Sequence, residues 1–298
     1  MAKPVRLALL EGIDLPVPEA SSVVVARRSG GDHLLVVGDR SSVMAESRLH
    51  EGRPGTWHLI DLATVEGWPE HAGDSQFEAL ACDGGALAAV MREDPAEVLV
   101  VDTGARALRA HIRLLVPPWS ALAGRWDDPS SRGEGLLLLR GGRLLVAKEK
   151  RPRALVEFGP AGTSPLGVGQ DDLLGVDEEW DSPLGEVDYH ALAVWRLKDA
   201  AKKSLGDISA IAAGRDRALW LLSDKSACVG RIELTERLAR GGGTITSLSQ
   251  TYRLPPEATK PEGFAMVDDD TALIALDTTR AHANGLLVHR TDVGGRES

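Results

Sequence analysis

The sequence predicts an all-β protein, and three observations support this prediction. A unit of two short apolar segments joined by a Gly- or Asp-containing turn recurs along the 298 residues, the 32 glycines and 16 prolines can supply many turns, and helical periodicity is scarce. In the clearest copy, the apolar segments 136–139 and 144–147 flank the turn 140–143. Two apolar segments around a glycine turn are typical of antiparallel strands.

The spacing of the repeat predicts a β-propeller. The first residues of the five copies lie 56, 56, 75 and 53 positions apart, and they are Ser22, Glu78, Glu134, Ser209 and Glu262. A third strand follows each pair, and a fourth follows in places, as at 108–116 and 244–253. Four antiparallel strands in about 55 residues are typical of a propeller blade. We therefore predict a single domain over residues 1–298 with five four-stranded blades. Six blades are the alternative, if the long third period contains a degenerate blade.

The two ends of the chain predict how the ring closes. The last copy ends at Arg290 without a fourth strand, and an apolar segment at residues 5–10 precedes the first copy. An N-terminal strand that completed the last blade would remove the open sheet edges. We therefore predict that this strand closes the ring.

The longest period contains an insertion at about residues 159–190, rich in Gly, Pro and acidic residues. An acidic surface loop is the expectation for such a segment. A calcium loop of the EF-hand type is less favoured, because residues 171–181 lack its regular alternation of ligands.

The overall charge and the lack of long apolar runs exclude several classes of protein. The net charge is −10 and the pI is about 5.3, whereas a generic nucleic-acid binder carries a basic excess. The longest apolar stretches have five or six residues, too few for a transmembrane helix, and residues 1–10 lack a secretory signal. We expect a cytoplasmic protein with no membrane partner, whose Cys82 and Cys228 are buried free thiols.

Repeated acidic residues predict a metal site at one mouth of the central channel. The start of the first strand and the end of the second lie on the same face of each blade, so the acids that begin the copies should converge. Clustered carboxylates without His or Cys favour a hard cation, Ca²⁺ before Mg²⁺. The predicted ligands are Glu78, Glu134, Asp207 and Glu262. The alternative is that these acids cap strand amides or pair with neighbouring cations.

A second set of repeated residues, at the ends of the second strands, is basic. Its members are Arg40, Arg92, Lys150, Lys225 and Arg280. They could clamp an anionic ligand against the metal, or form ion pairs within their own blades. In the nearby loops, His282 could act as a general base or be solvated. Trp119 and Trp126 could form an apolar wall or pack against turns.

Three short segments resemble the SdiA-regulated and phytase-like (esterase-like) propeller families. The segments are Glu134-Gly135-Leu136, Asp207-Ile208-Ser209-Ala210-Ile211 with Ser223-Asp224, and Pro261-Glu262-Gly263-Phe264. The resemblance covers roughly residues 77–290. It implies a propeller of five or six blades, a divalent ion such as calcium at the acidic mouth, and a hydrolytic or binding role. Members of these families are often exported, whereas no leader is recognisable here.

Together these patterns predict a propeller that binds a divalent cation and, through it, a small anionic or ester ligand. If the protein is an enzyme, metal-assisted ester or phosphoester hydrolysis is the expected reaction. Asp224 or His282 would then accept a proton, and Arg40, Lys150 and Lys225 would neutralise the developing negative charge. The alternative is a non-catalytic propeller that binds a protein or a metabolite.

Overall fold

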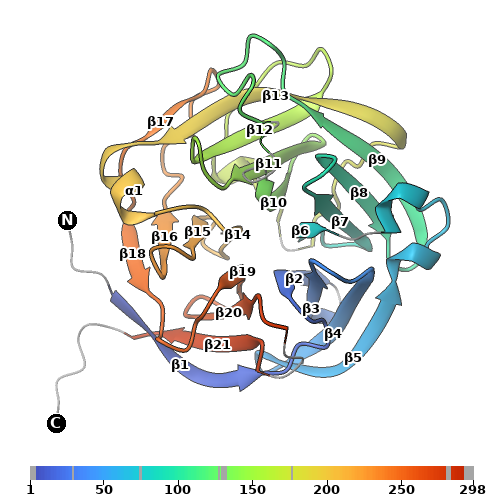
Figure 1. Cartoon of the computed structure of the whole chain (residues 1–298), viewed down its shortest axis with the longest axis vertical. Helices are drawn as coiled ribbons and strands as arrows, with labels where there is room; N and C mark the ends of the chain where they lie inside the picture. Colours follow the sequence, from blue (N-terminus) through green and yellow to red (C-terminus); the bar gives the residue numbers. More distant parts are fainter. Residues whose placement is uncertain are drawn as a thin grey trace.

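The computed structural model shows an all-β chain whose strands are arranged around a central axis (Figure 1). It describes residues 5–28, 30–73, 76–126, 128, 133–175, 177–279 and 283–291. Besides strands, the described residues form α1 (Asp199–Ser204) and the 3-10 turns η1 (Leu62–Thr64), η2 (Glu70–Gly73) and η3 (Gln170–Asp172). None of the helices in these ranges has the length and apolar character needed to cross a membrane.

Residues 20–197 form three units of four consecutive strands. Within each unit, the strands pair antiparallel in chain order. The first contains β2 (Ala20–Arg28), β3 (Gly31–Gly38), β4 (Val43–His50) and β5 (Arg53–Asp61). The second contains β6 (Phe77–Cys82), β7 (Leu87–Arg92), β8 (Glu97–Asp102) and β9 (Ala107–Leu115). The third contains β10 (Gly133–Leu139), β11 (Arg143–Lys148), β12 (Ala154–Pro160) and β13 (Gly185–Leu197).

The remaining strands form two further groups. One contains β14 (Ala210–Ala213), β15 (Leu219–Ser223), β16 (Cys228–Ile232) and β18 (Gln250–Arg253), while β17 (Gly243–Ile245) pairs with β13. The other contains β19 (Pro261–Met266), β20 (Thr271–Leu276) and β21 (Gly285–Arg290). The N-terminal strand β1 (Val5–Ile13) pairs antiparallel with β21 along most of its length, and at Val5 and Arg6 it pairs parallel with β18.

The inner strands β2, β6, β10, β14 and β19 surround the axis, each in contact with the next, and β19 also contacts β2 (Figure 1). The apolar core is divided among the interfaces between consecutive units. The interface between the last group and the first has the same character, since Leu273 of β20 belongs to one buried cluster with Val23 and Leu34. Each unit therefore buries its apolar surface against both neighbours.

Backbone hydrogen bonds link neighbouring units near the starts of the inner strands. The Gln76 N–H donates to the Asp39 carbonyl at 2.8 Å, and the Ile208 N–H donates to the Glu149 carbonyl at 3.2 Å. The carbonyl in each pair follows the second strand of one unit, and the N–H comes shortly before the inner strand of the next. These bonds hold the start of an inner strand beside the end of the second strand of the preceding unit.

The long insertion differs from the expected surface loop, because part of it is buried. Val168, Leu173 and Trp180 are almost fully shielded from solvent. The buried guanidinium of Arg143 pairs with Asp172 of the insertion at 3.0 Å and with Glu157 of β12 at 2.6 Å. Asp172 thus attaches the insertion to the sheets, while Asp171, Asp177, Glu179 and Asp181 are exposed.

Gly135 and Gly263, which directly follow Glu134 and Glu262, permit close contact between inner strands. A Cβ at Gly135 would lie 2.7 Å from the backbone nitrogen of Ile211 in β14. A Cβ at Gly263 would lie 3.0 Å from the backbone nitrogen of Val23 in β2. The Glu-Gly pairs in the sequence therefore have a steric reason, because the strand next to the axis leaves no room for a side chain there.

Gly135→Ala should destabilise the protein, because the added methyl group meets the backbone nitrogen of Ile211 as well as its side chain, and the backbone cannot move aside easily. Overpacking of this kind costs about 1–3 kcal/mol, which corresponds to a fall in Tm of about 2–10 °C. Gly241→Ala is the matched control, since a Cβ there meets nothing within 4 Å. Equal melting temperatures for the two variants in a thermal unfolding experiment would contradict the close packing of β10 on β14.

Candidate functional site

A β-bulge at the start of an inner strand positions each of the three glutamates. In β6 the pairing with β7 shifts between Phe77 and Ala79, which leaves Glu78 as the extra residue. Glu134 in β10 and Glu262 in β19 occupy the same position in their own strands. Bulges redirect side chains at strand ends and are frequent beside functional sites. This repeated irregularity sets the direction of the carboxylates at the mouth.

The bulge also corrects the alignment of the first repeat. In β2 the shift lies between Ala20 and Ser22, so Ser21, and not Ser22, stands in the position of the glutamates. Ser22 instead accepts a hydrogen bond from the Leu80 N–H at 3.0 Å through its Oγ, which links β2 to β6. The Ser21 Oγ donates to the Phe77 carbonyl. Both serines therefore join neighbouring inner strands.

Burial and mutual repulsion raise the pKa of all three glutamates, and burial is the larger cause. Burial and then Asp39 raise the pKa of Glu78 to about 9. Burial and then Glu78 raise the pKa of Glu134 well above its usual value. Burial and then Asp277 raise the pKa of Glu262 to about 7. Since these carboxyls and their acidic neighbours influence one another across three inner strands, they lie near one another at one mouth.

Further acids surround these glutamates. The acids that follow the second strands and raise the pKa of at least one of the three are Asp39, Glu93, Glu149, Asp224 and Asp277. Like charges at such short range disfavour ionisation of every member unless a cation is present. This mouth is the main concentration of perturbed carboxyl groups in the described chain.

Lys148 is a component of this mouth that the sequence reasoning did not single out. It is the last residue of β11 and is fully buried, with its Nζ 5.9 Å from the centre of the Trp126 ring. Burial lowers the pKa of its ammonium to about 8, while carboxylates that include Asp128 and Glu134 oppose that shift. In the sequence, Lys148 follows directly on the apolar run 144–147, and that run predicts only a strand. A lysine at the buried end of such a strand, next to acidic residues, is the signal that could have identified it.

Asp207, the fourth predicted ligand, is buried and already hydrogen-bonded within its own unit. Its carboxylate accepts hydrogen bonds from the Ser223 Oγ at 2.6 Å and from the Lys225 N–H at 3.3 Å. The neighbouring Asp224 is exposed, and burial followed by the charge of Asp207 raises its pKa. Asp224 in turn raises the pKa of Glu262, so it lies within electrostatic range of the mouth.

The donor chemistry of the mouth fits a hard cation, although no set of ligands is preformed. Glutamate and aspartate oxygens are the ligands that Ca²⁺ and Mg²⁺ prefer. Within the described ranges, no three His, Cys, Asp or Glu side chains are close enough together to hold a metal ion. A cation would therefore have to draw the glutamate side chains inward or be held partly through water.

The predicted basic residues lie in different surroundings. Arg40 is exposed and pairs with Glu19 at 2.9 Å, while Arg92 is buried and pairs with Glu97 at 2.7 Å. Lys150 pairs with Glu149, and with Lys225 it lines a hollow beside α1. The basic residues of this hollow are Lys150, Arg151, Arg153, Arg196, Lys198, Lys202 and Lys225. The structure thus brings Lys150 and Lys225 together and leaves Arg40 in a separate ion pair.

The remaining candidates are the residues predicted to lie in loops near the mouth and the two cysteines. Arg280 and His282 lie outside the described residues. Trp126 is buried and packs on Phe158 with ring centres 5.2 Å apart, whereas Trp119 is 82% exposed. The two tryptophans therefore form no shared wall. Cys82 and Cys228 are both free thiols, and Cys82 is only half-buried.

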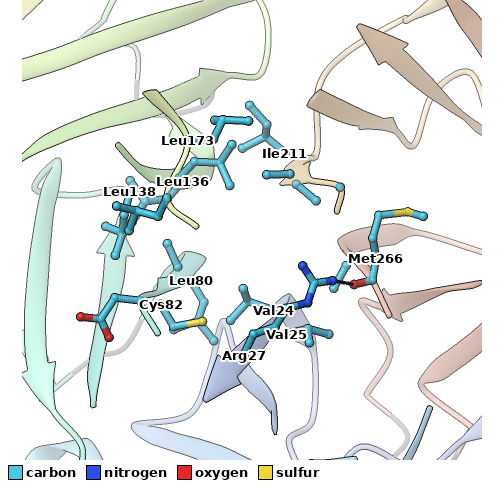
Figure 2. Close-up of a pocket in the computed structure, with 18 of the residues that line it drawn as sticks. Val24, Val25, Arg27, Leu80, Cys82, Leu136, Leu138, Leu173, Ile211 and Met266 are labelled. Carbon is cyan, nitrogen blue, oxygen red and sulfur yellow. Dashed lines mark hydrogen bonds between the residues drawn. The ribbon is translucent and has the colours of Figure 1, made fainter. Parts of the chain in front are cut away.

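A central cavity lies along the inner strands and is lined mainly by their apolar side chains (Figure 2). Val24 and Leu80 lie on its wall with Leu136 and Ile211. Arg27, next to the last residue of β2, also lines it. The cavity thus lies along the middles and ends of the inner strands, and the three glutamates at the strand starts do not line it.

Comparisons with known proteins identify the fold. No protein-family model matches the sequence, and no curated protein matches it. Among solved structures, the calcium-binding protein regucalcin from Agrobacterium tumefaciens matches with a TM-score of 0.51 at 13% identity, over 97% of this chain and 95% of that chain.

Two other structures match over similar lengths but with lower TM-scores. The PQQ-bound aldose sugar dehydrogenase from Streptomyces coelicolor has a TM-score of 0.46 at 12% identity, over 97% of this chain and 99% of that chain. A streptogramin B lyase has a TM-score of 0.45 at 11% identity, over 96% and 97% of the two chains. At 13% identity the likeness to regucalcin concerns the fold alone, and together with the strands arranged around one axis it shows a β-propeller fold.

Proposed function

We propose that this propeller binds a divalent cation at its acidic mouth and, through the cation, a small anionic or ester ligand. The observation that carries the proposal is the gathering of Glu78, Glu134 and Glu262, whose pKa values are all raised by burial and by neighbouring acids. A bound cation would remove this repulsion and ionise the carboxyls. Oxygen ligands favour Ca²⁺, with water completing its shell.

The three glutamates would be the direct ligands of the cation. Asp207 is the fourth proposed ligand, and it would have to exchange its bond to Ser223 for the cation or act through water. Lys148 lies beside Glu134 as a buried positive charge, so it limits how much cationic charge the mouth needs. One divalent ion is therefore the expected stoichiometry.

The anionic group of the ligand would lie toward the basic hollow. Lys150 and Lys225 line that hollow together, and both belong to the ends of second strands that surround the mouth. Lysine side chains bind phosphate or carboxylate groups as mobile point charges. Arg40 would contribute only after leaving its ion pair with Glu19.

Metal-assisted hydrolysis is the chemistry that such a site could perform. The bound cation would polarise the scissile group of the ligand and make a bound water more acidic. Asp224 would accept the proton, because it is exposed, lies within electrostatic range of Glu262 and has a raised pKa. The ion pair of Lys150 with Glu149 favours the second candidate function, binding of a metabolite or protein without turnover, since a paired lysine neutralises developing charge less well.

The architecture on which the site depends is also proposed in finer detail. We propose five four-stranded blades in one domain over residues 1–298, with β1 as the fourth strand of the last blade. The antiparallel pairing of β1 with β21 supports this assignment. The kinship with the SdiA-regulated and phytase-like families is supported by the Glu-Gly and Ser-Asp segments alone. A cytoplasmic location stays a prediction from the sequence.

Calcium should stabilise the wild-type protein, and Glu134→Gln should remove most of this effect, because the amide is a weaker ligand and carries no charge. At a calcium concentration of 100 times Kd, the Tm should rise by roughly 5–10 °C in a thermal unfolding experiment. Glu257→Gln, at an exposed site, should respond like wild type. If Glu134→Gln gains as much stability from calcium as wild type, the cation does not bind at this mouth.

Without metal, stability should fall as the pH rises from 5 to 9. The folded-state pKa values of Glu78 and Glu262, about 9 and about 7, exceed the unfolded value of 4.5, so the folded state binds more protons across this range. Their contribution to stability is complete below pH 4.5 and is lost as the pH rises through the folded values. Glu78→Gln cannot ionise, so its free energy of unfolding in EDTA, measured by urea titration, should depend less on pH. An unchanged slope would show that Glu78 does not titrate in this way.

Hydrolysis and simple binding can be separated with Asp224→Asn. The calcium-loaded protein is assayed with phosphoesters, carboxyl esters and lactones, with and without EDTA. If it is a hydrolase, Asp224→Asn should lower kcat by about 10²–10⁴-fold with little change in calcium affinity. No turnover of any substrate by the calcium-loaded wild type would favour the binding function.

A further inference from the structure

The central cavity has chemistry that the proposed cation site does not use. It has a volume of about 160 Å³, smaller than the roughly 300–1,000 Å³ of drug-sized ligand pockets. Apolar side chains from all five inner strands named above line it, including Val23, Leu80, Leu136, Leu138, Ile211 and Phe264. A small apolar group would be shielded from water here. The cavity leads away from the acidic mouth toward the ends of the inner strands.

Arg27 places a positive charge at that end of the cavity without a carboxylate partner. Its Nη2 donates to the Met266 carbonyl across the cavity at 3.4 Å, a long hydrogen bond (Figure 2). Its Nε–H is buried and has no hydrogen-bond partner. Among the residues that the structure describes, no carboxylate lies within ion-pair distance of Arg27. Burying a charged group in apolar surroundings without a partner is costly, so such a group is a candidate for ligand binding.

The neighbours of Arg27 leave its charge only partly compensated. Burial, followed by the charge of Arg215, lowers the pKa of the Arg27 guanidinium, while Asp32 and Asp269 act in the opposite direction from a greater distance than an ion pair. Asp32 already pairs with Arg215 at 2.9 Å. Arg217 lines the same end of the cavity. An anion placed between these arginines would therefore be stabilised.

The insertion forms the opposite wall at this end. Leu173, Leu174 and Gly175 line the cavity there, and the insertion is held close to β6 by the bond from the Gly84 N–H to the Glu178 carbonyl at 2.9 Å. A molecule in the cavity would thus contact apolar surface on the strands and on the insertion. Asp83 also lines the cavity, but its carboxylate already accepts hydrogen bonds from the Gly85, Leu87 and Trp180 N–H groups, so the arginines would supply the positive contacts.

We infer that the cavity binds a small apolar monocarboxylate, with its carboxylate on Arg27 and its hydrocarbon body against the inner strands. A guanidinium matches the two oxygens of a carboxylate with parallel donors. A doubly charged phosphate would lose more solvation in this apolar space than one guanidinium could restore. The site is separate from the cation site, since its residues lie at the ends and middles of the inner strands and the glutamates at their starts.

Isothermal titration calorimetry of the full chain in EDTA with hexanoate tests this inference. Wild type should bind hexanoate, and neither hexanol nor hexylamine should bind with comparable affinity. Arg27→Gln should weaken hexanoate binding by roughly tenfold or more, the range expected for a lost charged hydrogen bond. Arg27→Lys keeps the charge and should lose less. Arg109→Gln, at an exposed position on β9, is the control and should bind like wild type.

Several results would overturn the inference. They are no detectable binding of hexanoate to wild type, equal affinity for hexanol, or equal losses in Arg27→Gln and Arg109→Gln. If Arg27→Gln fails to fold by circular dichroism, the comparison of Arg27→Lys and Arg215→Gln with wild type decides, because both should weaken binding. Glu134→Gln should leave hexanoate binding intact, and this result separates the cavity from the cation site.

Discussion

The narrow space around the axis is the constraint on which the rest of the structure depends. Neighbouring inner strands approach so closely that a side chain at Gly135 or Gly263 would meet the backbone of the next strand. Each of these strands starts with a bulge, which turns the preceding glutamate away from that contact and toward the mouth. The clustering of carboxyls, with their raised pKa values, is therefore a consequence of packing. A cation at the mouth would relieve repulsion that the fold itself creates.

The two ends of the ring of inner strands differ in charge because all inner strands run in the same direction along the axis. Their starts bring glutamates together, and their ends bring together Arg27, Cys82 and Met266. The middle is apolar, since it also contributes to the core between units. The proposed cation site and the proposed carboxylate site therefore lie at different positions along these strands. The buried pairs of Arg143 fix the insertion that bounds the arginine end.

Much of the fold could be predicted from the sequence, while the site was predictable only in part. The turn 140–143 joins β10 to β11 as expected, with Gly141 and Gly142 at positive φ. The register of the first repeat was wrong by one residue, because a bulge leaves no mark on an apolar pattern. The burial of Asp172 in the insertion was not predicted, because its partners Arg143 and Arg237 are distant in sequence.

The sequence by itself determined the alternation of strands and turns and the acidic residue at the start of three inner strands. These features depend on neighbouring residues, so periodicity and spacing reveal them. Only the tertiary structure decided that Lys148 is buried beside Glu134 and that Arg27 faces an apolar cavity without a carboxylate partner among the described residues. Such environments arise from the packing of distant units. These environments alter the pKa of a charged group through desolvation and through neighbouring charges, and no local sequence pattern reveals those neighbours.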